Sequence, residues 1–179
     1  MTVRTATPDD ADAIERVRTE TWRATYRGLM PDAVLDRLGY DGSRRRRYMT
    51  AMRAEQFVLV TEHDGEMVGF CNGGPARDTD GAHPGEIYAI YVLPTHHGHG
   101  HGSALMRAGA RELLARGLRG MVIWVLRENS ASRTFYERMG GRYLEARDED
   151  REIEGTTVTE SGYVWDDISA LAAGRDRGR

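Results

Sequence analysis

Three glycines alternate with histidines at one point of this chain, and this run constrains the fold more than any other feature. Gly98, Gly100 and Gly102 lie between a strand-forming and a helix-forming segment. Glycine loses the most conformational freedom on ordering, so such a cluster indicates backbone at positive φ or the close approach of a ligand. Successive amides in a turn that enters a helix form a concave set of donors, which suits a phosphate or pyrophosphate group. From these residues alone, a purely structural turn remains equally open.

The segments around this run predict a mixed α/β domain. Residues 86–93 are β-branched and aromatic, which predicts a strand, and residues 103–115 carry apolar side chains at helical spacing. The same reasoning predicts strands at 3–6, 57–60, 67–70, 121–126 and 156–165, and helices at 8–28, 31–52 with a break at 39–42, and 130–139. This order indicates an α+β domain built on a largely antiparallel sheet.

Length and composition narrow the class of protein. The chain has 179 residues, which predicts a single domain over residues 1–174 and a disordered tail at 175–179. Its 25 basic and 28 acidic side chains give a formal charge of -3, so no global field attracts nucleic acid. No apolar run approaches the roughly 20 residues that span a bilayer. The first residues lack the apolar stretch of a secretory signal, so export by that route is not expected. The single cysteine, Cys71, is expected to be a buried thiol. We therefore expect a cytoplasmic protein with no nucleic-acid or membrane partner.

Three elements, in the right order, resemble the GNAT superfamily of acyl-CoA-dependent N-acetyltransferases. The glycine-histidine run is similar to the family's pyrophosphate-binding pattern, residues 86–92 to the strand before it, and Asn129, Tyr136 and Gly140 to a second motif. The resemblance covers nearly the whole chain and implies the GNAT fold, with about seven strands and about four helices. It also implies transfer of an acetyl group from acetyl-CoA to a primary amine by direct attack in a ternary complex, without a metal, and it allows a homodimer.

The resemblance implies which residues bind the cosubstrate. The backbone N–H of Ile90 is expected to meet the acetyl oxygen, and backbone groups of Val92 to hold the pantetheine arm. For Asn129, a bond to the cosubstrate and turn chemistry beside Ser130, the expected N-cap, are both open. The full implied set is Ile90, Tyr91, Val92, His97, Gly98, His99, Gly100, His101, Gly102, Ser103 and Asn129.

Two side chains are implied to move protons. An amine with a pKa of about 10.4 is almost wholly protonated near neutral pH, so a base must remove its proton. Glu86 matches the family's base. Ile90 lies about 13 Å along the strand from Glu86, so a water chain is needed. Tyr136 matches the acid that protonates the departing thiolate. The alternatives are a solvated carboxylate at the strand end and a core tyrosine beside Phe135.

Two residues depart from the family pattern. His97 replaces the usual Arg or Gln, and Gly141 replaces a Phe. Because most donors to the pyrophosphate are backbone amides, the first change is expected to weaken binding only modestly. The second leaves a packing position unfilled.

The acceptor and two other classes of function remain open. Four histidines within six residues (His96, His97, His99 and His101) favour a metal-binding protein as an alternative. A non-catalytic acyl-CoA sensor is another. The amine acceptor is expected between the N-terminal helices and residues 141–157, where Trp22 and Tyr26 form either an aromatic wall or core packing. The acidic residues there either attract a cation or form a polar loop; they are Asp148, Glu149, Asp150, Glu152 and Glu154.

Overall fold

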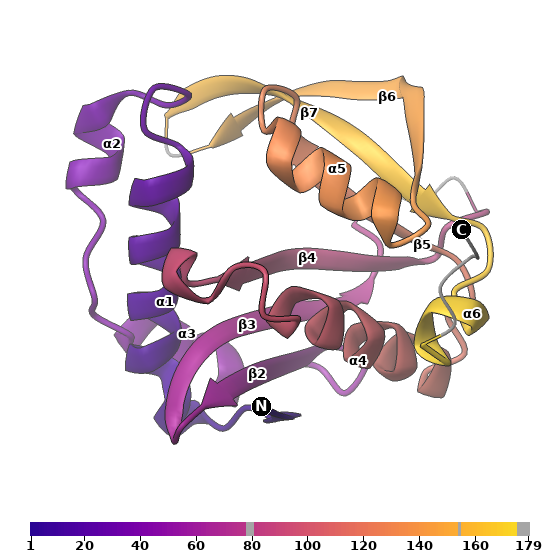
Figure 1. Ribbon diagram of the computed structural model, residues 1–179, viewed down its shortest axis with the longest axis horizontal. Helices are drawn as coiled ribbons and strands as arrows, with labels where there is room; N and C mark the ends of the chain where they lie inside the picture. The colour runs from indigo at the N-terminus through magenta and orange to yellow at the C-terminus, as the bar shows by residue number, and fades with distance from the viewer. Residues whose placement is uncertain (78–80, 154, 175–179) are drawn as a thin grey trace.

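One seven-stranded sheet runs through the protein (Figure 1). The structure is a computed structural model that describes residues 1–77, 81–153 and 155–174. The predicted tail at 175–179 and Glu154 lie outside these residues. The strand order is β1-β2-β3-β4-β5-β7-β6, and every neighbouring pair is antiparallel except β4 and β5. The strands are β1 (Thr2–Thr5), β2 (Phe57–His63), β3 (Glu66–Pro75), β4 (Gly85–Val92), β5 (Met121–Leu126), β6 (Arg142–Ile153) and β7 (Thr156–Trp165). The predicted α+β fold with a largely antiparallel sheet is confirmed.

The described part of the chain holds six α-helices, two more than expected. They are α1 (Ala11–Thr25), α2 (Asp32–Asp36), α3 (Ser43–Thr50), α4 (His101–Ala115), α5 (Ser130–Arg138) and α6 (Ser169–Ala172). The predicted break at 39–42 divides the second helix into α2 and α3. The short helix α6 follows the last strand and was not predicted, because four residues are too few to show a periodicity.

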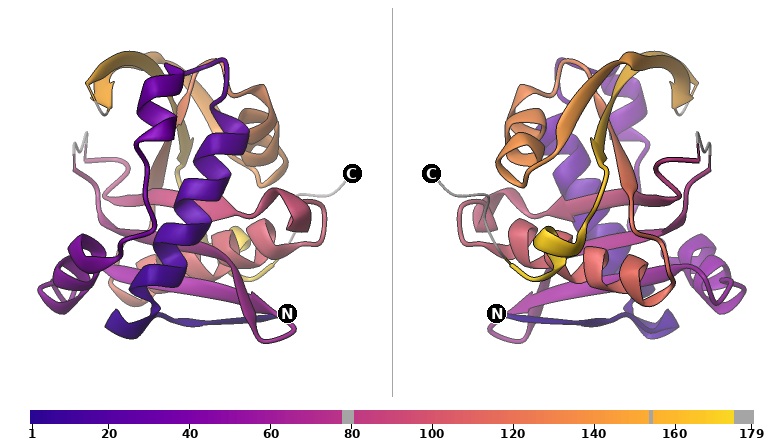
Figure 2. Two further views of the ribbon diagram at one scale, coloured as in Figure 1. Left: turned by 90° about the vertical axis from the view of Figure 1, so that its left-hand side faces the viewer. Right: turned by 90° about the vertical axis from the view of Figure 1, so that its right-hand side faces the viewer.

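The helices cover both faces of the sheet (Figure 2). Helices α4, α5 and α6 pack on one face around Ile87, Leu105 and Leu113, and burial of each such side chain stabilises the fold by about 1.5–3 kcal/mol. Helices α1, α2 and α3 pack on the other face around Ile14, Leu35 and further apolar side chains. Cys71 is fully buried as expected, and burial raises the pKa of its thiol to about 12.

The two parallel strands at the centre of the sheet, β4 and β5, are paired over only part of their length. Only Gly85, Glu86 and Ile87 of β4 pair with β5. Beyond them the strands diverge into a wedge that opens toward α1 (Figure 1). In the β3–β4 pair Asn72 lies opposite Ala89 and Gly73 opposite Ile87, so Tyr88 is the extra residue of a β-bulge. A bulge bends its strand and interrupts the ladder, which sets β4 apart where the wedge begins.

The acidic stretch after Gly141 is a strand, which was not predicted, so the alternative of a polar loop does not hold. Residues 149–153 of β6 pair with 156–160 of β7. Asp148 accepts a hydrogen bond from Tyr143 and Asp150 accepts one from Thr159. One of these carboxylates is thus satisfied within β6 and the other across the ladder, and composition alone did not reveal either contact.

Among residues 1–77, 81–153 and 155–174, no helix combines the length and apolar character needed to cross a membrane.

Candidate active site

The wedge between β4 and β5 holds a cleft of about 580 Å³, within the usual range for small-molecule sites. Residues 88–92 line it from β4 and residues 123–126 from β5. The α4 side contributes 96–98 and 100–103, and the α5 side contributes Asn129, Ala131, Ser132, Phe135, Tyr136 and Arg138. The opposite side contributes Thr21, Trp22, Thr25, Tyr26, Met30, Ile153 and Glu160. The cleft is thus lined from both faces of the sheet.

Two of the three glycines in the run have the positive φ that was one of the two interpretations of the sequence. Gly98 and Gly100 have φ of 79° and 84°, and Gly100 is the N-cap of α4. A side chain would be strained at either position whatever the space around it. Gly102 lies in the first turn of α4, where a Cβ would come within 3.3 Å of the Phe135 ring. The helix begins at His101 rather than Ser103, so its positive N-terminal end lies within the cleft wall.

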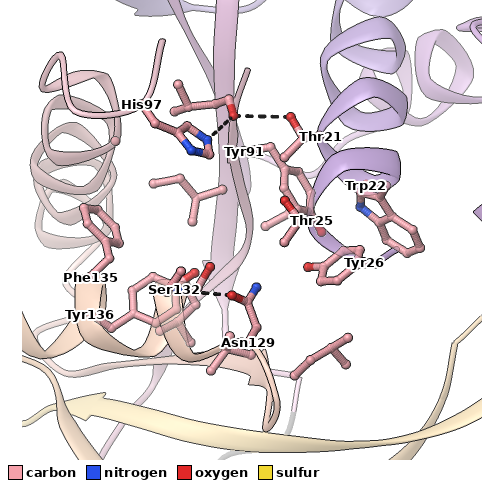
Figure 3. A pocket seen from close by; sticks show the side chains of 18 of the residues that line it. Thr21, Trp22, Thr25, Tyr26, Tyr91, His97, Asn129, Ser132, Phe135 and Tyr136 are labelled. Atoms are coloured by element: carbon pink, nitrogen blue, oxygen red, sulfur yellow. Dashed lines mark hydrogen bonds between the residues drawn. The ribbon is translucent and has the colours of Figure 1, made fainter. Parts of the chain in front are cut away.

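His97 makes a contact that the sequence did not reveal. Its Nε2 lies 2.8 Å from the carbonyl oxygen of Val92, which also accepts a hydrogen bond of 3.3 Å from the Thr21 hydroxyl (Figure 3). Both lone pairs of this oxygen are therefore engaged within the protein. His99 is exposed and lies outside the described residues that line the cleft, whereas His97 lines it.

His101 is buried at the start of α4 and anchors the loop to the sheet. Its Nδ1 lies 2.9 Å from the hydroxyl of Thr61 on β2, and its ring packs edge-to-face with His63 and His96. Burial and these neighbouring imidazoles lower the pKa of His101 below its ordinary value. Among the described residues, no group of three or more His, Cys, Asp or Glu side chains is arranged to hold a metal ion.

Asn129, and not Ser130 as expected, is the N-cap of α5. Its side-chain oxygen accepts a hydrogen bond of 3.1 Å from the backbone N–H of Ser132 (Figure 3). The side chain is buried and also lines the cleft. Its amide NH₂ remains on the same side chain as a donor, so capping and a contact with a ligand are compatible.

Tyr136 belongs both to the hydrophobic core and to the lining of the cleft. It is 6% exposed, packs against Phe135 and Tyr163, and lines the cleft from α5. Burial raises the pKa of its hydroxyl above the ordinary value for tyrosine. The hydroxyl therefore carries its proton at any physiological pH.

Glu86 lies outside the described residues that line the cleft. It is 1% exposed, at the base of the wedge, where its carboxylate accepts hydrogen bonds from the backbone N–H and the guanidinium of Arg77. The expected alternative of a solvated carboxylate was wrong, because the residue is buried in an ion pair. A base role for Glu86 stays a prediction.

Trp165 fills the packing position that Gly141 leaves open. A Cβ at Gly141 would lie 2.7 Å from the Trp165 indole, so this ring occupies the space beside the glycine. The indole is nearly buried and donates a hydrogen bond of 3.0 Å to the carbonyl of Met139. The loss of an aromatic side chain at 141 is thereby matched by an aromatic residue on β7.

The side of the cleft that faces α1 is aromatic, with one carboxylate. Trp22 packs edge-to-face with Tyr26 at 5.2 Å and with Tyr91 at 6.4 Å, and the Trp22 side chain also belongs to the apolar cluster beneath α2. Both roles considered for these residues, wall and core, therefore apply. Glu160 of β7 lies opposite Leu126 of β5 and was missed. The sequence offered one signal, a single carboxylate within the strand predicted at 156–165.

Comparison with known proteins identifies the family. The model of the acetyltransferase (GNAT) family matches residues 14–141. The chain belongs to this family. The resemblance seen in its three sequence elements is thus confirmed, and the cleft described above is the candidate active site of a GNAT acetyltransferase.

Related GNAT proteins match nearly the full chain. The uncharacterized N-acetyltransferase YuaI of Bacillus subtilis (strain 168) is 32% identical over 171 residues, which cover 96% of both chains. The PaiA N-acetyltransferase of Thermoplasma acidophilum, solved in complex with coenzyme A, has a TM-score of 0.71 and 17% identity over 92% of this chain and 98% of that one. The YncA structure from Salmonella typhimurium, solved with acetyl-CoA, has a TM-score of 0.70 and 24% identity over 92% of each chain. At these identities the two structures show the shared fold.

Proposed function

We propose that this protein transfers the acetyl group of acetyl-CoA to a primary amine by direct attack in a ternary complex. The observation that carries the proposal is the cleft at the divergence of β4 and β5, because it is lined from both faces of the sheet. The cosubstrate enters from the α4 and α5 face, and the amine from the α1 and β7 face. Neither has to leave before the other arrives.

The α4 loop is proposed to seat the pyrophosphate. The N-terminus of α4 supplies backbone amides and partial positive charge, and Gly98 and Gly100 leave open space beside them, since no atom lies within 4 Å of a Cβ built at either. His97 and Arg138 also line the cleft; the Nε2 of His97 is engaged by the carbonyl of Val92, so Arg138 is the side chain proposed to add donors. Ile90, Tyr91 and Val92 line the path of the pantetheine arm along β4.

The proposed transfer forms one bond and breaks one. The amine nitrogen attacks the acetyl carbonyl carbon, the C–N bond forms, the C–S bond breaks, and the thiolate takes a proton from Tyr136. The backbone N–H of Ile90 is proposed to stabilise the oxyanion. Because burial raises the pKa of Tyr136, its proton transfer to a thiolate is uphill unless the thiolate is desolvated as well. If Glu86 acts as the base, Arg77 must release it for a water chain.

Thiol release by the purified full-length protein tests this function. The protein is mixed with acetyl-CoA and a panel of primary amines, and free CoA thiol is measured, with CoA binding followed separately by calorimetry. We expect binding of CoA and amine-dependent release of thiol. Absence of both contradicts the proposal, whereas binding without turnover on any amine favours the acyl-CoA sensor. The cytoplasmic location and the homodimer stay predictions.

A further inference from the structure

Within the described residues, the cleft has one acidic side chain, Glu160, and its position differs from that of the cationic groups. The cationic side chain Arg138 belongs to α5, and the imidazoles of His96, His97 and His101 belong to the α4 loop and the start of α4. Glu160 belongs to β7 and shares a face of the sheet with Leu126, which packs against Trp22 of α1. The cleft therefore has a cationic end for an anion and an anionic end for a cation.

We propose, on the basis of the proposed function, that Glu160 binds the ammonium group of the acceptor and accepts its proton, and that the acceptor is a cationic primary amine on an apolar body. The carboxylate side chain is 14% exposed. Its one polar contact among the described residues joins Oε2 to Nε of Arg151 at 3.3 Å, which leaves Oε1 for a ligand.

The apolar body follows from the walls of this end. Trp22, Tyr26, Met30, Leu126 and Ile153 line the cleft around Glu160. The indole nitrogen of Trp22 is buried and has no hydrogen-bond partner among the described residues, with the ring 8% exposed (Figure 3). A buried N–H without a hydrogen-bond partner destabilises the folded protein unless a ligand accepts a hydrogen bond from it.

The charged groups around Glu160 suit proton transfer. Arg151 and Arg77 favour its ionised form, Glu86 and Glu149 disfavour it, and burial is the largest effect. The net result raises the pKa of Glu160 above its ordinary value, which makes it a better base than an exposed carboxylate. Tyr26 and Tyr91 also face this charge, and burial raises the pKa of both hydroxyls, so they stay neutral.

With Glu160 as the base, every proton that the ammonium nitrogen loses is accounted for. Glu160 takes one proton from the ammonium, and the neutral amine attacks the thioester. After the attack, the nitrogen loses a second proton, which restores the one that Tyr136 gives to the thiolate. One proton per turnover then leaves Glu160 for solvent.

The test compares Glu160→Gln with the matched control Glu149→Gln. Glu149 lies opposite Glu160 in the ladder, pairs with the same Arg151, and lies outside the described lining of the cleft. The probes are phenethylamine, which is an ammonium at pH 7.5, and aniline, which is already neutral. We expect E160Q to lower kcat/KM for phenethylamine by about 100-fold and for aniline by less than about threefold. E149Q is expected to change kcat/KM on either probe by less than about threefold, because Glu149 acts on Glu160 only through its charge.

The pH profile separates Glu160 from Glu86. The acid limb of kcat/KM for phenethylamine is expected to disappear in E160Q and to persist in Glu86→Gln. Equal activity of E160Q and the parent on phenethylamine, an equal loss on both probes, or loss of the acid limb in E86Q alone overturns the proposal. Glu160→Asp, which keeps the charge, is expected to recover part of the activity if E160Q folds poorly.

A binding experiment distinguishes this proposal from the proposed function. Calorimetry measures phenethylammonium binding to the parent and to E160Q, with and without CoA. Weaker binding by E160Q supports the proposal, and no binding to the parent overturns it, even if acetyl-CoA is turned over. Failure to bind CoA contradicts only the proposed function, because the amine measurement without CoA still reports on Glu160.

Discussion

The two ends of the cleft are built in different ways. The end at α4 is made of consecutive residues, with Gly98, Gly100 and the first turn of the helix supplying backbone donors. The end at α1 is made of side chains from α1, β5 and β7, with Trp22 and Glu160 brought together by the sheet. A backbone site tolerates changes of side chain but not of φ, whereas a side-chain site tolerates neither loss of charge nor loss of shape.

This difference fits what each end is proposed to recognise. A pyrophosphate has the same shape and charge in every molecule that carries it, so an array of amides is sufficient. An amine acceptor has to be distinguished from other amines, and discrimination requires specific side chains. The comparison therefore predicts where substitutions have large effects and where they have small ones.

The largest expected effect lies where the two ends meet, at Tyr136. Tyr136→Phe removes the proposed acid and is expected to lower kcat by about 100-fold while CoA affinity stays nearly constant. A thiol-release assay measures kcat, and calorimetry measures the affinity for CoA. Tyr143→Phe is the control, since its hydroxyl contacts Asp148 away from the cleft. Equal rates for Y136F and the parent contradict the acid role.

A pair of glycine substitutions tests the backbone end. Gly100 and Gly117 have φ of 84° and 79°, and a Cβ at either meets no atom within 4 Å. Gly100→Ala and Gly117→Ala are expected to destabilise the fold equally, by about 1–2 kcal/mol. Only G100A is expected to weaken CoA binding, by about tenfold, because it alone displaces amides of the α4 loop. Similar CoA affinities in both variants would show that the loop is merely structural.

A smaller effect is expected from His97→Ala. The side chain occupies a family position for Arg or Gln, but its imidazole contacts the carbonyl of Val92. We expect the dissociation constant for CoA to rise by less than about threefold, since one neutral hydrogen bond near solvent contributes little. A tenfold rise measured by calorimetry would mean that side chains dominate this end as well.

The smallest effect concerns stability at the side-chain end. In the folded protein, burial raises the pKa of Glu160 above its ordinary value of 4.5. The contribution of Glu160 to the free energy of unfolding is therefore fully present below the pKa of the unfolded state, and it is lost as the pH rises through the pKa of the folded state. The glutamine side chain of the E160Q variant does not titrate, so the variant does not lose stability in this way. Its Tm relative to the parent is therefore expected to rise by about 1–3 °C between pH 4.5 and pH 8. A relative Tm that falls over this range contradicts a raised pKa.

Sequence reasoning succeeded where structure is local. The strands β4, β5 and β7 and the Tyr136 helix depend on neighbouring residues, and each was predicted. Positive φ was one of two interpretations of the glycine run, and it holds at Gly98 and Gly100. Strand β6 was not predicted. The N-cap of α5 was displaced by one residue, from Ser130 to Asn129, because both residue types suit that position. Glu86 was assigned by the family resemblance. Its partner Arg77 lies two residues after the end of β3, and the sequence did not reveal that this segment returns to Glu86.

The sequence by itself determined the family, the order of the elements and the donor loop at α4, because each is written in residues close to one another. Only the tertiary structure decided that Trp165 fills the space beside Gly141, that Arg77 holds Glu86, and that Glu160 lies in the cleft. These outcomes depend on strand register and on the divergence of β4 from β5. Register pairs residues that are far apart along the chain, and a shift by one position would turn every side chain to the other face.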